Sequence, residues 1–172
     1  MFSKPFPFQK LAACLLATVL LLVSSAFSPV LAASSTYEVA LNETETYTLT
    51  VRELNQGKKL FGAACGQCHI GGVTYTNPDV GLKLEELELA TPRRDTIAAI
   101  IDYLENPTTY DGSESLLEYH PNTQLTSVYP KMRNLSKEDM KLIAGYILYE
   151  AKNLPGWGGT KNETHSDLSQ YL

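Results

Sequence analysis

The stretch AACGQCHIGG, from Ala63 to Gly72, contains two cysteines that are separated by two residues and followed directly by a histidine. This spacing matches C-x-x-C-H, the attachment signal for c-type haem. Two thiols one helical turn apart can add to the two vinyl groups of a porphyrin, while the adjacent imidazole binds the iron from one face. We therefore expect Cys65 and Cys68 to form thioether links to one covalently bound haem c and His69 to be an axial ligand of its iron.

Three other interpretations of the two cysteines need different surroundings. A disulfide between Cys65 and Cys68 is plausible outside the cytoplasm. A structural zinc site needs two more Cys or His ligands at short spacing, and the chain has none there. A thioredoxin-like redox pair needs a βαβ setting, whereas a helical pattern precedes this motif. Haem attachment fits best.

The start of the chain has the features of a secretory signal peptide. Lys4 and Lys10 precede the apolar run LAACLLATVLLLV, which is too short to cross a bilayer and is followed by small residues up to Ala32. We predict a signal peptide over residues 1–32, and Cys14 would be lost with it. An uncleaved membrane anchor is the alternative.

The remaining residues, 33–172, are enough for one domain. Removing Lys4 and Lys10 with the signal peptide changes the formal net charge from −5 to −7. An acidic chain of this kind is a poor match for nucleic acid, and we expect no nucleic-acid partner. It better suits a soluble protein that docks on a basic face of a partner.

The pattern of apolar residues divides the exported chain into a hairpin, a helical core and a tail. Residues 33–51 alternate apolar and polar side chains around the turn NETE, which predicts a small β-hairpin extension. The haem-binding core covers residues 52–155, and residues 156–172 form a C-terminal tail. The helix VRELNQGKKLFGAA would run straight into Cys65, with Leu54, Lys58 and Phe61 at helical spacing.

Two further helices are predicted in the core. One begins with Thr91 as its N-cap and Pro92 at its first position, and it stops before Pro107. The other is opened by Ser136, with Asp139 three residues later in a variant of the capping box. The expected apolar faces are Ile97, Ile100, Ile101 and Leu104 on the first helix and Met140, Ile143, Ala144, Ile147 and Ala151 on the second.

Two residues compete for the sixth position on the iron. Met132 lies in a loop shortly before the last helix, and His120 is followed by Pro121, which restricts the backbone around the histidine. His165 lies in the polar tail and Met140 on an apolar helix face. Spacing alone leaves Met132 and His120 equally good candidates.

The helix that carries Gly57 and Phe61, together with the last helix and its LIAGYIL stretch, resembles the terminal helix pair of class I cytochromes c. The resemblance implies a mainly α fold, a class I cytochrome c-like helical domain around one haem, with a small N-terminal β-hairpin. From about Leu54 to Gly159 the chain resembles the cytochrome c-550 family. The matching strings include NPTTYDG, EYHPN, YPKMRNLSKEDM and LPGWGG, which are more specific than C-x-x-C-H.

This resemblance implies that His69 and His120 are the two axial ligands and that Met132 packs beside the haem. A bis-histidine iron has a low potential and no open position, so we expect no enzyme activity. The family implies an extrinsic subunit of photosystem II on the lumenal side of the thylakoid membrane. It would be peripheral to the membrane, would bind the intrinsic core and other extrinsic subunits, and would stabilise the manganese-calcium cluster and its calcium and chloride requirement.

Other functions remain open at this point. In a soluble electron carrier with His/Met ligation, exposed cations such as Lys58, Lys59, Lys131 and Arg133 would face the partner. A haem peroxidase or gas sensor would need a five-coordinate iron. After Gly159 the chain continues with a longer polar tail than the family pattern has, which suggests different docking or a divergent paralogue.

Overall fold

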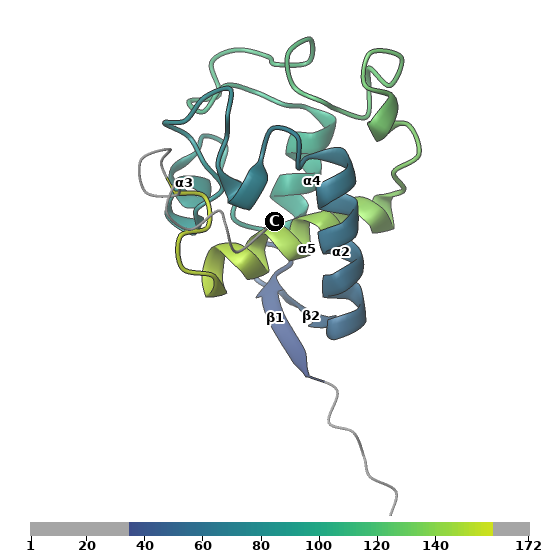
Figure 1. Ribbon diagram of the computed structural model, residues 1–172. Helices are drawn as coiled ribbons and strands as arrows, with labels where there is room; N and C mark the ends of the chain where they lie inside the picture. Colours follow the sequence, from purple (N-terminus) through teal and green to yellow (C-terminus); the bar gives the residue numbers. More distant parts are fainter. Residues whose placement is uncertain (1–34, 160–172) are drawn as a thin grey trace, which may run out of the picture. The chain divides into compact units, whose positions relative to one another are not determined.

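Two helices, α2 (Val51–Ala64) and α5 (Lys137–Asn153), cross at the centre of the computed structural model, which describes residues 35–159 (Figure 1). At the crossing the backbones approach closely, because a Cβ atom added to Gly57 would lie 2.2 Å from the carbonyl oxygen of Leu142 and 2.9 Å from Cβ of Tyr146. Only glycine fits this contact. The predicted signal peptide and residues 160–172 of the tail lie outside the described residues.

The N-terminal hairpin is formed by β1 (Thr36–Ala40) and β2 (Thr46–Thr50), which pair antiparallel. Val39 and Leu49 are buried, and Leu49 packs against Gly145 of α5. The alternation of apolar and polar residues correctly predicted this element. Val51, which the pattern assigned to both the hairpin and the following helix, is the first residue of α2.

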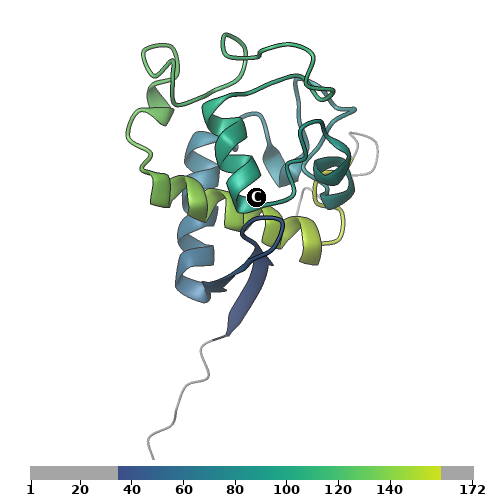
Figure 2. The same ribbon diagram turned by 180° about the vertical axis from the view of Figure 1, so that it is seen from behind.

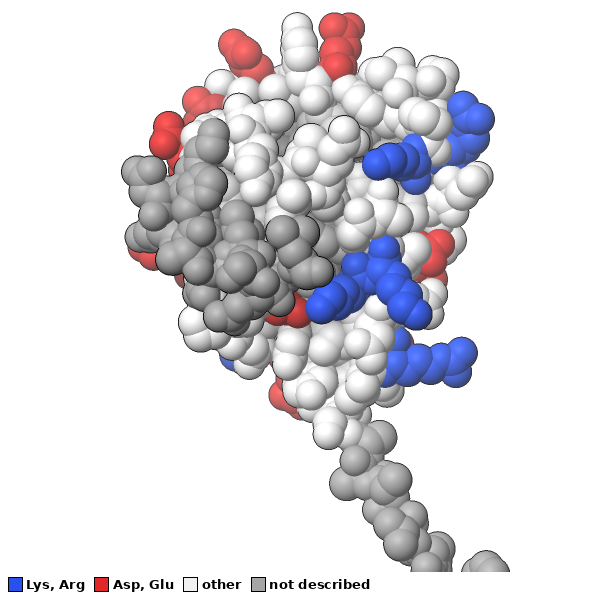
Figure 3. Space-filling view, in the orientation of Figure 1, with Lys and Arg blue, Asp and Glu red and all other residues white. Residues whose placement is uncertain are grey.

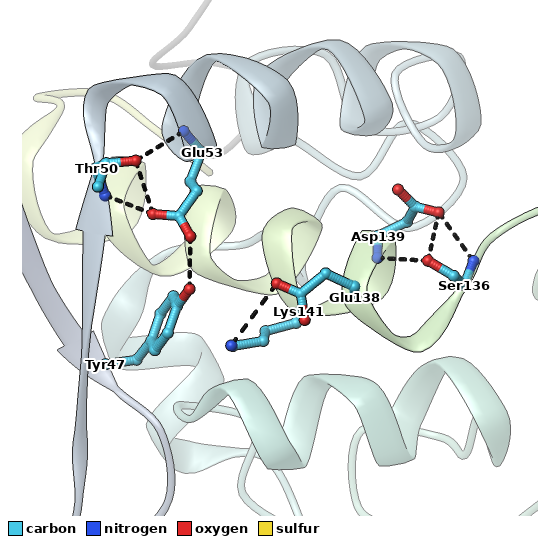
Figure 4. Close-up of polar contacts among 7 residues, drawn as sticks. All are labelled: Tyr47, Thr50, Glu53, Ser136, Glu138, Asp139 and Lys141. Carbon is cyan, nitrogen blue, oxygen red and sulfur yellow. Dashed lines mark hydrogen bonds and ion pairs between the residues drawn. The ribbon is translucent and has the colours of Figure 1, made fainter.

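Capping boxes begin both central helices (Figure 4). At α2 the hydroxyl of Thr50 accepts a hydrogen bond from the backbone N–H of Glu53 at 3.2 Å, and the Glu53 carboxylate accepts one from the backbone N–H of Thr50 at 2.8 Å. The hydroxyl of Tyr47 donates to the same carboxylate at 2.7 Å. At α5 Ser136 and Asp139 make the corresponding pair, as the sequence predicted.

Replacing Thr50 by alanine should lower the free energy of unfolding by about 1 kcal/mol at neutral pH, because the amide of Glu53 loses its acceptor. The backbone N–H of Thr50, followed by the hydroxyls of Tyr47 and Thr50, lowers the pKa of the Glu53 carboxyl. Since a lowered folded-state pKa stabilises the protein above the ordinary value of about 4.3, this contribution is lost as the pH falls through the lowered value. Urea titrations at pH 7 and pH 3 should therefore show a smaller effect at acid pH, and an equal effect would contradict this account.

The third long helix, α4 (Ile97–Glu105), begins five residues later than predicted. Its N-cap is Thr96, whose hydroxyl accepts from the backbone N–H of Ala99 at 3.1 Å. Thr91 is not a cap, because its backbone N–H donates to Tyr110, and Arg94 N–H donates to Leu87. These bonds tie residues 91–94 to neighbouring segments. The predicted end before Pro107 and the apolar face are correct, with Ile97, Ile100 and Leu104 buried.

The short helix α3 (Leu84–Leu89) and the 3-10 turns η1 (Ile70–Gly72) and η2 (Pro130–Met132) were not predicted. Figures 1 and 2 show the long loops after α4 on the opposite side of α5 from the hairpin. Helix α5 contacts α2, α3, α4 and β1, so it is buried on nearly all sides. Its buried residues are Met140, Leu142, Ile143, Ala144, Gly145, Tyr146, Ile147 and Leu148.

Candidate functional site

The C-x-x-C-H motif continues α2 by one turn. Cys65 is the C-cap of the helix, and its backbone N–H donates to Phe61 at 2.8 Å. The backbone N–H groups of Cys68 and His69 both donate to the carbonyl of Cys65 at 3.0 Å. The end of a helix anchored in the core therefore holds all three residues of the motif.

The segment after His69 turns sharply with the help of glycine. Gly72 has φ of +79°, and a Cβ atom there would lie 2.6 Å from the indole ring of Trp157. Beyond this turn the hydroxyl of Thr74 lies 3.2 Å from Nδ1 of His69. An Nδ1–H that donates to this hydroxyl leaves Nε2 free to bind a metal, which is the usual arrangement of a metal-binding histidine.

His120 comes from the loop after α4, and its ring is oriented by the backbone. Nδ1 lies 2.9 Å from the carbonyl oxygen of Pro121, and since a carbonyl only accepts, Nδ1 carries the proton and Nε2 carries the lone pair. The amide of Asn122, which is fully buried, donates to the carbonyls of Leu117 at 2.7 Å and His120 at 2.8 Å. Its oxygen accepts from two further backbone N–H groups. Asn122 thus holds the loop in shape.

The structure brings His69 and His120 together, with ring centres 6.2 Å apart and ring planes at 53°. Two imidazoles that bind one metal ion from opposite sides, with metal–nitrogen distances of about 2 Å, have ring centres about 6 Å apart. Burial, and then the charge of His120, lowers the pKa of His69 to about 4, and burial also lowers the pKa of His120. Both rings are therefore neutral at pH 7, the form that binds iron.

The thiols do not fit the competing interpretations. Cys65 and Cys68 are free cysteines. Burial, and then Cys68, raises the pKa of the Cys65 thiol to about 12, whereas redox-active thiols have lowered pKa values. Within residues 35–159 no group of three or more Cys, His, Asp or Glu side chains is arranged to hold a metal ion. The donor set that remains is two thiols and two facing imidazoles, which fits a haem c.

Met132 lies in η2 with only 2% of its surface exposed, and it belongs to the apolar core together with Met140. Its place among apolar side chains is consistent with a packing role beside the site. The choice of His120 over Met132 as the sixth ligand stays a prediction, which the facing imidazoles favour.

Two buried donors have no hydrogen-bond partner among the described residues, Nε of Arg94 and Nε1 of Trp157. Buried polar groups are normally paired, so an unpaired donor suggests a bound group with acceptor atoms. Haem has carboxylate side chains that can accept such bonds. The sequence analysis missed Thr74, Arg94 and Asn122, because their roles depend on contacts that no local pattern encodes.

A helix pair that crosses beside a C-x-x-C-H turn, with a second imidazole facing that of the motif, defines a class I cytochrome c. The model of the cytochrome c-550 domain matches residues 30–164. The chain belongs to the cytochrome c-550 family.

Relatives and solved structures agree with this assignment. The chain is 61% identical to photosystem II extrinsic protein V of Synechococcus sp. (strain JA-2-3B'a(2-13)), over the full length of both chains, and 47% identical to that of Cyanophora paradoxa over 94% of this chain and 98% of the relative. The crystal structure of cytochrome c549 matches with a TM-score of 0.68 and 47% identity, over 71% of this chain and 95% of that chain. The PsbV2 cytochrome of Thermosynechococcus elongatus matches with a TM-score of 0.63 and 39% identity, over 73% and 90%. The first alignment extends through the tail, which weighs against a divergent paralogue.

Proposed function

We propose that the protein binds one haem c through thioether links from Cys65 and Cys68, with His69 and His120 as the axial ligands of the iron. The observation that carries this proposal is the pair of imidazoles facing each other at 6.2 Å directly beside the C-x-x-C-H turn. The helix end holds the two sulfurs and His69, while the loop fixed by Asn122 presents His120 from the other side.

When bound, the haem supplies a reversible one-electron change at the iron. The protein's own residues determine how this change is used. His69 and His120 would hold the iron from both sides and would leave no position for oxygen or peroxide, and two imidazoles would favour a low potential. The protein is therefore an electron-transfer or structural subunit rather than an enzyme.

We further propose that it is an extrinsic subunit of photosystem II in the thylakoid lumen, where it stabilises the manganese-calcium cluster and the binding of calcium and chloride. The names of its relatives support this role. No helix in the described part of the chain is long and apolar enough to cross a membrane. Its partners would be the intrinsic core and the other extrinsic subunits, bound from the lumenal side.

Several exposed cations lie close together on one side of the face drawn in Figure 3, which suits docking through charge. Figure 3 shows most of the basic side chains in that view along one edge, over α2 and η2, and many acidic side chains on the opposite side. This separation of charge would orient the protein as it approaches a partner. The exposed basic residues of α2 are Arg52, Lys58 and Lys59. Lys131 lies in η2, and Arg133 follows it directly as its C-cap.

Two measurements test the proposal separately. Mass spectrometry and the visible spectrum of the exported protein should show covalently bound haem, and a bare polypeptide mass with no Soret band would disprove the haem site. A tagged copy should co-purify with the oxygen-evolving complex and be released by high salt, which screens surface charge. A haem-loaded protein that never co-purifies, and whose oxidised form shows a Met-to-iron band in the far red, would instead support a diffusible carrier with Met132 as the ligand.

A further inference from the structure

Arg94 is a buried cation without a carboxylate partner among the described residues. Only 9% of its surface is exposed. Its Nη2 donates to the carbonyl oxygens of Thr108 at 3.1 Å and Thr109 at 2.7 Å, and its Nε is buried and unpaired. Burial lowers the pKa of Arg94, but an arginine side chain stays protonated in proteins. The site therefore holds a full positive charge, and no acidic side chain among residues 35–159 pairs with it.

A single aromatic ring separates this charge from His120. The guanidinium carbon of Arg94 lies 4.0 Å from the ring centre of Tyr103, and the ring of Tyr103 meets that of His120 edge-on at 4.9 Å. These two contacts limit the distance from the guanidinium to the imidazole to about 9 Å, within a Debye length at moderate salt. Burial raises the pKa of Tyr103, so this ring is neutral and adds no opposing charge.

A buried cation at this distance would act on a redox change at an iron bound by the neighbouring imidazole. Reduction of the iron adds one electron and makes or breaks no bond, so the charge of the site falls by one unit. A fixed positive charge favours the reduced form. An iron bound by His120 would lie about 3 Å beyond the ring centre, so the guanidinium would be within about 12 Å of it. With an effective dielectric constant of about 20, a unit charge at that distance changes the ratio of the two forms by about tenfold.

We propose that Arg94 is a positioning residue that raises the reduction potential of the haem held by His69 and His120, and so offsets part of the lowering that two imidazoles impose. This inference depends on the proposed haem site. Tyr103 is uncharged and holds the guanidinium of Arg94 beside His120. The carbonyl oxygens of Thr108 and Thr109 fix the direction of the Arg94 side chain.

Arg94→Gln in the haem-loaded protein tests the proposal. Redox titration with dye mediators, using dithionite as reductant and ferricyanide as oxidant, should show at least a tenfold shift towards the oxidised form, which is about 59 mV for one electron. The visible spectrum should not change, because both imidazoles remain. The matched control is Arg93→Gln, one residue away, where the side chain is 63% exposed and paired with Asp95. Its potential should match the wild type.

A conservative variant separates charge from structure. Arg94→Lys keeps the charge but loses the forked hydrogen bonds, so its potential should stay closer to wild type than that of Arg94→Gln. A purely structural role predicts equal effects of both variants. If Arg94→Gln does not accumulate, Arg94→Met removes the charge without burying an unpaired amide.

The outcomes distinguish the two proposals. A loaded variant with an unchanged spectrum and a wild-type potential would overturn the role of Arg94 and leave the haem site standing. Wild-type protein without haem would instead remove the site on which the inference depends.

Discussion

His120→Ala should retain the covalently attached haem, bind carbon monoxide in its reduced form, and have a higher reduction potential than the wild type. Cys65, Cys68 and His69 stay in place at the end of α2, so attachment does not depend on the loop. Loss of one imidazole opens an axial position and removes an electron-rich ligand that favours ferric iron. Axial ligands set haem potentials over about 0.8 V, so a large change is expected. Wild-type protein should not bind carbon monoxide.

Met132→Leu is the matched control for this experiment. Leucine conserves the volume of a side chain that is 2% exposed, and such replacements usually cost less than about 1.5 kcal/mol. The variant should keep the spectrum and the potential of the wild type. The ligand is misassigned if His120→Ala leaves the spectrum unchanged, or if Met132→Leu opens the iron to carbon monoxide.

Gly57→Ala should lower the free energy of unfolding by about 3 kcal/mol or more. The added methyl group would lie 2.2 Å from the carbonyl oxygen of Leu142 and 2.9 Å from Cβ of Tyr146. Neither atom belongs to the flexible end of a side chain, so the two helices must move apart. Loss of their packing also disturbs the helix end that carries Cys65. Denaturant titration followed by far-ultraviolet circular dichroism measures the effect.

Gly62→Ala supplies the control in the same helix. A Cβ atom at Gly62 meets nothing within 4 Å, and the position is exposed. Here alanine should stabilise the protein by about 0.4–1 kcal/mol, because it restricts the unfolded chain and favours the helix. Equal effects of the two substitutions would show that the backbones do not approach as closely as the structure indicates.

The elements that the sequence predicted well are those with signals inside themselves. The hairpin has an alternating pattern around a turn, and α5 has a capping box. The start of α4 was misplaced because Thr91 and Thr96 are both good N-caps, and only backbone bonds to Leu87 and Tyr110 decide between them. The helix propensities of single residues contain no information on such hydrogen bonds between distant segments.

The sequence indicates the two iron ligands unequally, and both assignments stay predictions. His69 follows from the motif, but spacing alone left His120 and Met132 equal, and the resemblance to a family decided between them. The fold supplies the physical reason, since the loop is closed by Asn122 and places His120 opposite His69. No sequence pattern indicated Arg94, because its proposed role depends on its burial and on its contact with Tyr103, nine residues later in α4.

The enclosure of α5 limits how this protein can change over evolution. A helix at the surface has one face on which side chains can vary freely, but almost every side chain in the middle of α5 meets another part of the protein. A larger residue there would press on a neighbouring helix or on the hairpin, and a smaller one would leave a void. New surface properties are therefore expected at the exposed positions of the other elements, at the two ends of α5 and on the loops, while the middle of the central helix keeps nearly the same shape.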